Sequence, residues 1–94
     1  MAIIAFDVDG TLISFKDRPK EDTIKLLKLL HGMGNRIIVW SGGGRDYAKT
    51  WVQKLYLEDY VDEVKDKFDK HEYVDICFDD EMVDLAIINI KIDK

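Results

Sequence analysis

Two carboxylates stand two residues apart, directly after an apolar run and directly before a glycine. The run at residues 2–6 is followed by residues 7–11 (DVDGT), which supply Asp7, Asp9 and Gly10. In an extended chain, residues i and i+2 project to the same side, and a turn at Gly10 would let Asp9 swing away while its backbone stays near Asp7. This arrangement suits a hard cation that is shared with a nucleophile, so the motif predicts phosphoryl chemistry.

Polar residues also follow two later apolar runs. They are Ser41, which precedes three glycines, and the pair Asp79-Asp80. Taken singly, each group has an ordinary explanation, such as turn formation by Asp and Gly. In an open α/β sheet, however, the carboxyl ends of the strands form the edge where ligands bind. The coincidence of three such strand ends favours a functional site there.

Apolar patterning predicts strands that alternate with helices. Strands are expected at 2–6, 36–40, 61–64, 74–78 and 85–90, and helices after Pro19 and at 45–57. The first two strands are apolar almost throughout, which is typical of strands buried on both faces of a parallel sheet. The sequence therefore predicts a single α/β domain over residues 1–94 with right-handed crossovers.

Composition excludes several classes of protein. The 94 residues, 47% hydrophobic and 35% charged, describe one globular domain and not a disordered tail. A net charge of −5 leaves no basic face for charge-driven nucleic-acid binding. Cys77 is the only cysteine, so no intramolecular disulfide is expected, and its apolar neighbours predict a buried thiol. No run is long enough to cross a membrane and no secretory segment follows Met1, so a cytoplasmic location is expected.

Four carboxylates are expected to converge at the sheet edge. They are Asp7, Asp9, Asp79 and Asp80. Like charges at such a site repel and raise one another's pKa values, and a divalent cation would relieve that repulsion. Ligands that are all oxygen favour Mg²⁺ over zinc or copper. The sequence therefore predicts Mg²⁺ as the cofactor.

These motifs, in this order, resemble the haloacid dehalogenase (HAD) superfamily of Mg²⁺-dependent phosphohydrolases. The family's first motif, DxDx[TV], is matched by residues 7–11, its second by Ser41, and its fourth by Asp79-Asp80. Its third motif is a lysine before the fourth strand, for which Lys70 is the preferred match and Lys67 the rival. The resemblance covers nearly the whole chain and implies a HAD-like Rossmannoid fold, a three-layer α/β/α sandwich with a mostly parallel sheet.

The resemblance also implies roles in a phosphomonoesterase. Asp7 would attack phosphorus and form an aspartyl-phosphate, and Asp9 would act as the general acid and base. Lys70 would neutralise the nucleophile and the phosphate. The metal would be held by Asp7, by the backbone carbonyl of Asp9, by Asp79 directly, and by Asp80 either directly or through water.

The resemblance further implies that the second motif holds the phosphoryl group. Ser41 and the backbone at Gly42 and Gly43 would contact the phosphoryl oxygens at the start of a helix, where anions bind well. Independently of the resemblance, Arg45 at the same helix start is expected to contact the substrate, because a positive charge at a helix N-terminus is unfavourable unless an anion such as phosphate lies beside it.

No cap domain fits this chain, because residues 12–20 and 57–75 are too short to hold one. The site is therefore expected to be open to solvent. An open site would accept large phosphorylated substrates, such as proteins or nucleic-acid ends, or would take a lid from a partner or from a second copy in an oligomer. Two alternatives stay open: a phosphotransferase that uses the same nucleophile, and a non-catalytic HAD-like module for phosphate binding or protein interaction.

Overall fold

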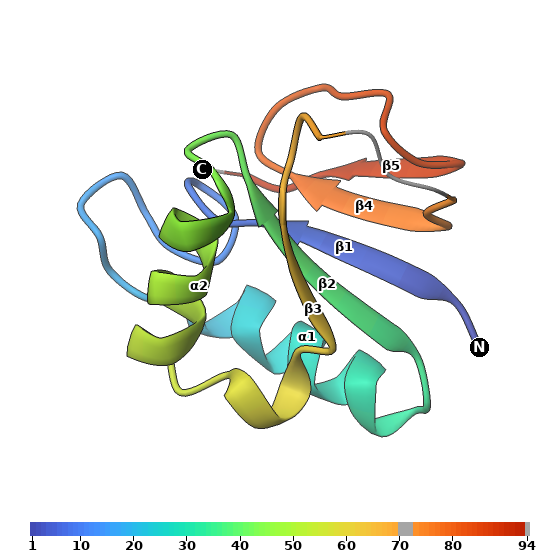
Figure 1. Ribbon diagram of the computed structural model, residues 1–94, viewed down its shortest axis with the longest axis horizontal. Coiled ribbons are helices and arrows are strands. Elements are labelled where there is room, and N and C mark those ends of the chain that lie inside the picture. The colour runs from blue at the N-terminus through green and yellow to red at the C-terminus, as the bar shows by residue number, and fades with distance from the viewer. Residues whose placement is uncertain (70–72, 94) are drawn as a thin grey trace.

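The computed structural model describes residues 1–69 and 73–93, which form a five-stranded sheet in the order β3-β2-β1-β4-β5 (Figure 1). All four strand pairings are parallel. The strands are β1 (Ile3–Asp7), β2 (Arg36–Ser41), β3 (Glu63–Asp66), β4 (Ile76–Asp79) and β5 (Ile88–Lys91). The helices are α1 (Glu21–Gly32), α2 (Arg45–Lys54) and the short 3-10 helix η1 (Glu58–Tyr60). The α/β class with a parallel, Rossmann-like sheet is confirmed, and the described residues contain no cap domain.

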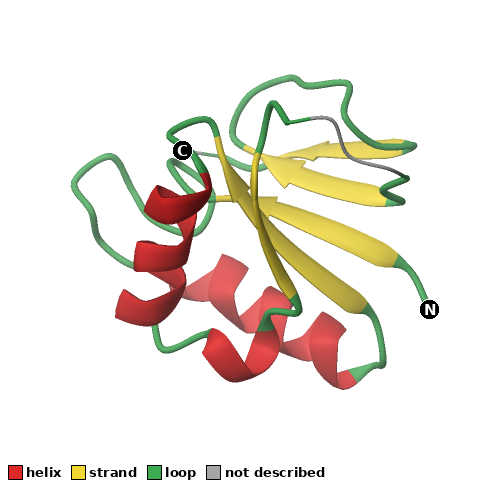
Figure 2. Cartoon of the chain, viewed as in Figure 1, coloured by secondary structure: helices red, strands yellow, loops and turns green. Residues whose placement is uncertain are grey.

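Both α-helices cover the same face of the sheet (Figure 2). Alternate residues of β1 and β2 point to this face and pack against Ile24 and Leu27 of α1 and against Ala48 and Val52 of α2. Because side chains alternate along a strand, the intervening residues form a second, smaller cluster on the other face.

The opposite face of the sheet differs from the predicted third layer of helices. Trp40 and Cys77 are covered there by side chains of the segment 83–86, and within 1–69 and 73–93 no helix packs on this face. The cause is the shortness of the connections that follow β3 and β4, because a parallel crossover that includes a helix needs about a dozen residues or more. A loop, and not a layer of helices, therefore covers this face of the sheet.

The order of the predicted strands and helices is confirmed, and their ends differ by a few residues. The helix predicted at 45–57 ends at Lys54 because the chain turns there: Tyr56 has φ +56°, and the amides of Tyr56 and Leu57 donate to the carbonyls of Gln53 and Val52. The last strand begins at Ile88 and not at 85, because the Asn89 side chain accepts hydrogen bonds from the preceding loop.

The sheet has its topological switch point between β1 and β4. From β1 the chain builds β2 and β3 on one side and then returns to build β4 and β5 on the other (Figure 1). Ligands of open α/β sheets bind at the carboxyl ends of the strands at such a point. Asp7 ends β1 and Asp79 ends β4, so both lie at this position.

In the part of the chain that the structure describes, none of the helices has the length and apolar character needed to cross a membrane.

Candidate functional site

Three carboxylates meet at the switch point. Asp7, Asp79 and Asp80 each offer an oxygen, and these oxygens all lie within 4.8 Å of one another. The side chains are buried, with exposed fractions of 5%, 0% and 4%. The register of the sheet causes this meeting, because Phe6 pairs with Phe78 and the next residues along the two strands are Asp7 and Asp79. This buried cluster could hold a metal ion.

Asp7 is held by two side chains besides the other carboxylates. The Thr11 hydroxyl donates to Asp7 Oδ2 at 3.3 Å, and Lys67 Nζ lies 3.4 Å from Asp7 Oδ1. Thr11 is wholly buried in the turn after β1, where three successive amides donate to the Val8 carbonyl. Each carboxylate oxygen of Asp7 therefore has a side-chain partner that orients it.

Lys67 brings positive charge to the carboxylate cluster. Its Nζ lies 2.5 Å from Asp79 Oδ2, and its backbone amide donates to the Ser41 carbonyl at 3.0 Å. Burial alone would lower the pKa of Lys67, but the carboxylates of Asp79 and Asp7 outweigh it and raise that pKa. The structure thus places the rival motif lysine, Lys67, at the cluster, whereas the preferred one, Lys70, lies outside the described residues.

Burial and mutual repulsion make the carboxylate cluster hard to ionise. Burial, followed by the negative charge of Asp79, raises the pKa of Asp7 from 3.8 to about 7, although Lys67 acts in the opposite direction. Burial also raises the pKa of Asp80, with a further contribution from Asp79. Near neutral pH the cluster therefore retains a proton or needs positive charge from a cation.

This electrostatic conflict predicts how stability depends on pH in metal-free protein. Asp7 titrates at 3.8 in the unfolded chain and at about 7 in the folded one, so between these values the folded state binds a proton that the unfolded state has lost. The resulting stabilisation is complete below the lower pKa and is lost as the pH rises through the higher one. We expect the free energy of unfolding to fall by on the order of 1–4 kcal/mol between about pH 5 and about pH 8.

Denaturant titrations in EDTA measure this effect. The variant Asp7→Asn should flatten the pH profile and should be more stable than the wild type at about pH 8. The exposed residue Asp59 on η1 provides the matched control, and Asp59→Asn should retain the wild-type profile. If the free energy of unfolding depended on pH in the same way in wild type and in Asp7→Asn, the raised pKa of Asp7 would not be the cause.

Gly10 makes room for the third carboxylate. Its φ is +81°, and a Cβ atom at this position would lie 2.5 Å from Asp80 Oδ2. Any side chain here would therefore both strain the turn and displace Asp80. Lys20 secures the same turn, because its ammonium donates to the Gly10 carbonyl at 2.8 Å and also to the Asp93 carbonyl.

Asp9 lies apart from the cluster, although it stands only two residues after Asp7. Its carboxylate is half-buried and accepts a hydrogen bond from the Tyr47 hydroxyl, 2.7 Å from Oδ1. The group of three carboxylates that could share an ion does not include Asp9. The turn at Gly10 thus separates the two carboxylates, so only three of the four carboxylates expected to converge at the sheet edge do so in the described residues.

Ser41 ends β2 beside the end of β1, because Asp7 pairs with Trp40 in the sheet. The Gly43 amide donates to Ser41 Oγ at 3.0 Å, and the Gly44 amide donates to the Ser41 carbonyl at 3.1 Å. Gly44, with φ +106°, is the N-cap residue of α2. The predicted second motif therefore forms a tight turn at a helix N-terminus next to Asp7.

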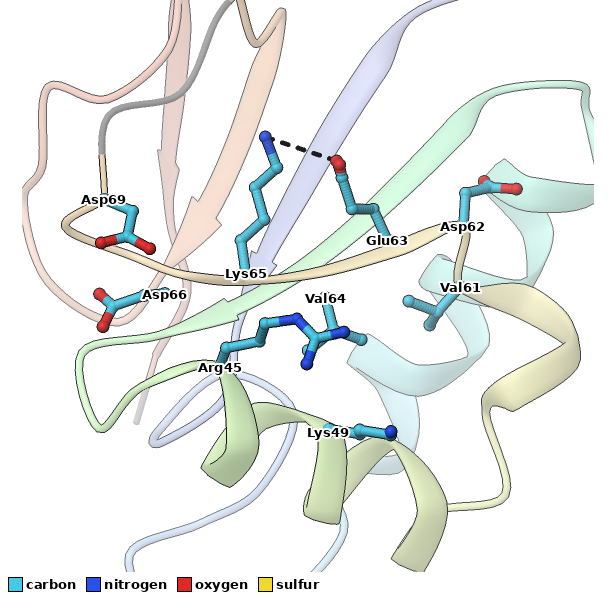
Figure 3. Close-up of a pocket in the computed structure, with 9 residues that line it drawn as sticks. All are labelled: Arg45, Lys49, Val61, Asp62, Glu63, Val64, Lys65, Asp66 and Asp69. Carbon is cyan, nitrogen blue, oxygen red and sulfur yellow. Dashed lines mark ion pairs between the residues drawn. The ribbon is translucent and has the colours of Figure 1, made fainter.

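Arg45 does not reach the carboxylate cluster. Its side chain lines a groove between α2 and β3 and points along β3 towards Val64 (Figure 3). Asp66 and Asp69 line the same groove, and the guanidinium lies 3.8 Å from the carboxylate of its neighbour Asp46. The predicted contact of Arg45 with a substrate held at Ser41 therefore has no support in the geometry.

Cys77 has no role in this site as a nucleophile. It is buried, and burial together with the charge of Asp79 raises the pKa of its thiol to about 12. The thiol consequently stays protonated, and the expectation of a buried cysteine is confirmed.

The chain gives no match when it is compared with family models, with curated proteins or with solved structures. The resemblance to the HAD superfamily therefore depends on the ordered motifs and on where the fold places them.

Proposed function

We propose that this protein is a Mg²⁺-dependent phosphomonoesterase that works through an aspartyl-phosphate on Asp7. The observation that carries the proposal is the meeting of Asp7 with Asp79, Asp80 and Lys67 at the switch point of the sheet. A structural role would not need several buried carboxylates whose pKa values are raised by burial and by one another. A site that binds a cation and an anionic substrate does need them.

The donor set fits Mg²⁺. Asp7, Asp79 and Asp80 would hold the ion with carboxylate oxygens, with the backbone carbonyl of Asp9 as the fourth proposed ligand. When bound, Mg²⁺ would offset the charge of the phosphoryl oxygens and of the three carboxylates.

Asp7 and Asp9 would divide the chemistry. An oxygen of Asp7, oriented by Thr11 and Lys67, attacks phosphorus as the bond to the leaving oxygen breaks. Protonated Asp9 gives its proton to that oxygen. Asp9 then takes a proton from the water that attacks the aspartyl-phosphate, which releases inorganic phosphate and restores Asp7.

Ser41 and Lys67 would hold the phosphoryl group. Because Ser41 Oγ already accepts from the Gly43 amide, its own proton is free to donate to a phosphoryl oxygen. The N-terminus of α2 adds favourable potential for an anion. Lys67 takes the role that the resemblance gives to the third-motif lysine, since it already contacts Asp7.

Removal of the metal tests this proposal. With para-nitrophenyl phosphate as substrate, we expect turnover in Mg²⁺ and a loss of at least about 100-fold in EDTA, restored by added Mg²⁺. The variant Asp80→Asn should raise the Mg²⁺ concentration needed for half-maximal rate, whereas Asp59→Asn should leave it unchanged. Turnover that survives complete chelation would contradict the proposal. Mg²⁺ and phosphate binding without turnover would favour a non-catalytic module.

A further inference from the structure

The two carboxylates of the first motif have different partners. Asp7 contacts Thr11 and Lys67 and lies in the metal-binding cluster, whereas the Asp9 carboxylate accepts from the hydroxyl of Tyr47 at 2.7 Å. Tyr47 belongs to the first turn of α2, so this bond joins the loop after β1 to the helix that follows Ser41.

The ring of Tyr47 is itself held in place. A Cβ atom at Gly43 would lie 3.1 Å from Tyr47 Cδ2 and 3.4 Å from Ser41 Oγ, so the ring packs directly on the turn that carries Ser41. The Tyr47 phenol is the donor in its hydrogen bond with Asp9, because a carboxylate oxygen accepts. The ring therefore lies beside the turn of Ser41 while its hydroxyl reaches Asp9.

We propose that Tyr47 is a positioning residue for Asp9. Its hydroxyl holds the Asp9 carboxylate out of the Asp7–Asp79–Asp80 cluster and on the side of Ser41, where the leaving oxygen of a bound phosphomonoester departs. This inference rests on the proposed phosphomonoesterase function. Without the hydroxyl, the Asp9 side chain is free to rotate, and a carboxylate so near the cluster can turn towards a bound cation. Proton transfer requires hydrogen-bond reach of the leaving oxygen, so a misplaced carboxylate loses most of its effect.

The variant Tyr47→Phe tests the role, because it keeps the ring on Gly43 and removes only the hydroxyl. Two substrates separate the steps: glycerol 2-phosphate has a leaving group that needs a proton, whereas para-nitrophenyl phosphate has one that does not. Both give the same aspartyl-phosphate, so single-turnover rates of leaving-group release isolate the first step. We expect Tyr47→Phe to slow release of glycerol by about 10- to 100-fold, the range for a hydrogen bond to a charged group. Release of nitrophenolate should stay within about threefold of wild type.

A purely structural tie between the loop and α2 would give a different pattern. It would slow both substrates alike and would lower thermal stability, which the positioning role leaves unchanged. The exposed residue Tyr56 provides the matched control, and Tyr56→Phe should behave as wild type with both substrates. Equal losses with both substrates in Tyr47→Phe would overturn the inference.

A double-mutant cycle shows whether Tyr47 acts through Asp9. In the Asp9→Asn background, Tyr47→Phe should slow release of glycerol by less than about twofold further, because the proton donor is already lost. Full additivity would overturn the inference. Wild-type turnover with no selective effect of Tyr47→Phe would reject the positioning role alone. Absence of wild-type turnover with either substrate would reject the proposed function, and the inference with it.

Discussion

Asp7→Asn should lower kcat for para-nitrophenyl phosphate in Mg²⁺ by about 10⁴-fold or more, as loss of a catalytic nucleophile does in other enzymes. An amide does not attack phosphorus, and the substitution also removes one carboxylate from the metal-binding cluster. Steady-state rates at saturating Mg²⁺ measure the effect.

The loss in Asp7→Asn has to be separated from unfolding. The substitution removes the ionisation that destabilises the metal-free protein, so this variant should be at least as stable as the wild type near neutral pH. The control Asp59→Asn removes an exposed carboxylate and should retain full activity. Activity of Asp7→Asn within tenfold of wild type would rule out Asp7 as the nucleophile.

Asp9→Asn should have the second largest effect, and its size should depend on the leaving group. With an alkyl phosphate, which needs a proton on departure, we expect a rate lower by about 10²–10⁴-fold. With para-nitrophenyl phosphate, the first release of nitrophenolate should be nearly normal. Later turnovers should be slow, because the variant has no carboxylate at position 9 to take the proton from the water that attacks the aspartyl-phosphate. Stopped-flow absorbance would show this as a burst followed by a slow phase.

Asp17 provides the matched control for Asp9. It is an exposed carboxylate of the loop that follows the first motif, and its φ of +58° is a conformation that asparagine also adopts. Asp17→Asn should therefore show no burst and normal rates with both substrates. An alkyl phosphate rate in Asp9→Asn within about threefold of wild type would exclude the acid role of Asp9.

The central strands and the first helix could be predicted from the sequence because their apolar residues follow clear patterns. The apolar runs of β1 and β2 are buried on both faces, and helix-spaced leucines mark α1. The bounds of the edge strand β5 could not be predicted in this way. Its residues Ile88 and Ile90 are apolar but exposed, so hydropathy does not mark where the strand begins. The end of α2 depends on a left-handed residue, Tyr56, where glycine would be the usual signal.

The site could be predicted where the topology alone determines it. Parallel strands bring their carboxyl ends to one edge, so Asp7, Ser41 and Asp79 lie at that edge whatever their side-chain conformations. The sequence could not settle the choice between Lys67 and Lys70. Both fall between two predicted strands, where side-chain directions do not repeat regularly as they do in a helix or a strand. The contact of Tyr47 with Asp9 depends on side-chain torsions in two separate elements, which a sequence pattern does not contain.

Arg45 shows how a local argument can mislead. An arginine at a helix N-terminus was predicted to face phosphate, because its charge there is otherwise unfavourable. In the structure, the Arg45 guanidinium lies 3.8 Å from the carboxylate of Asp46 and points along β3 towards Val64 (Figure 3). The groove between α2 and β3, which the sequence does not reveal, is where this side chain lies.

Chemical trapping of the phosphorylated residue tests the central claim most directly. In Asp9→Asn the aspartyl-phosphate should form from para-nitrophenyl phosphate and persist, since its hydrolysis lacks a base. Reduction with borohydride converts an acyl-phosphate to the alcohol, and tandem mass spectrometry then locates the modified residue. We predict homoserine at position 7, dependent on Mg²⁺ and on substrate. A burst of nitrophenolate without homoserine at position 7, or with the reduced residue at position 79 or 80, would contradict the account.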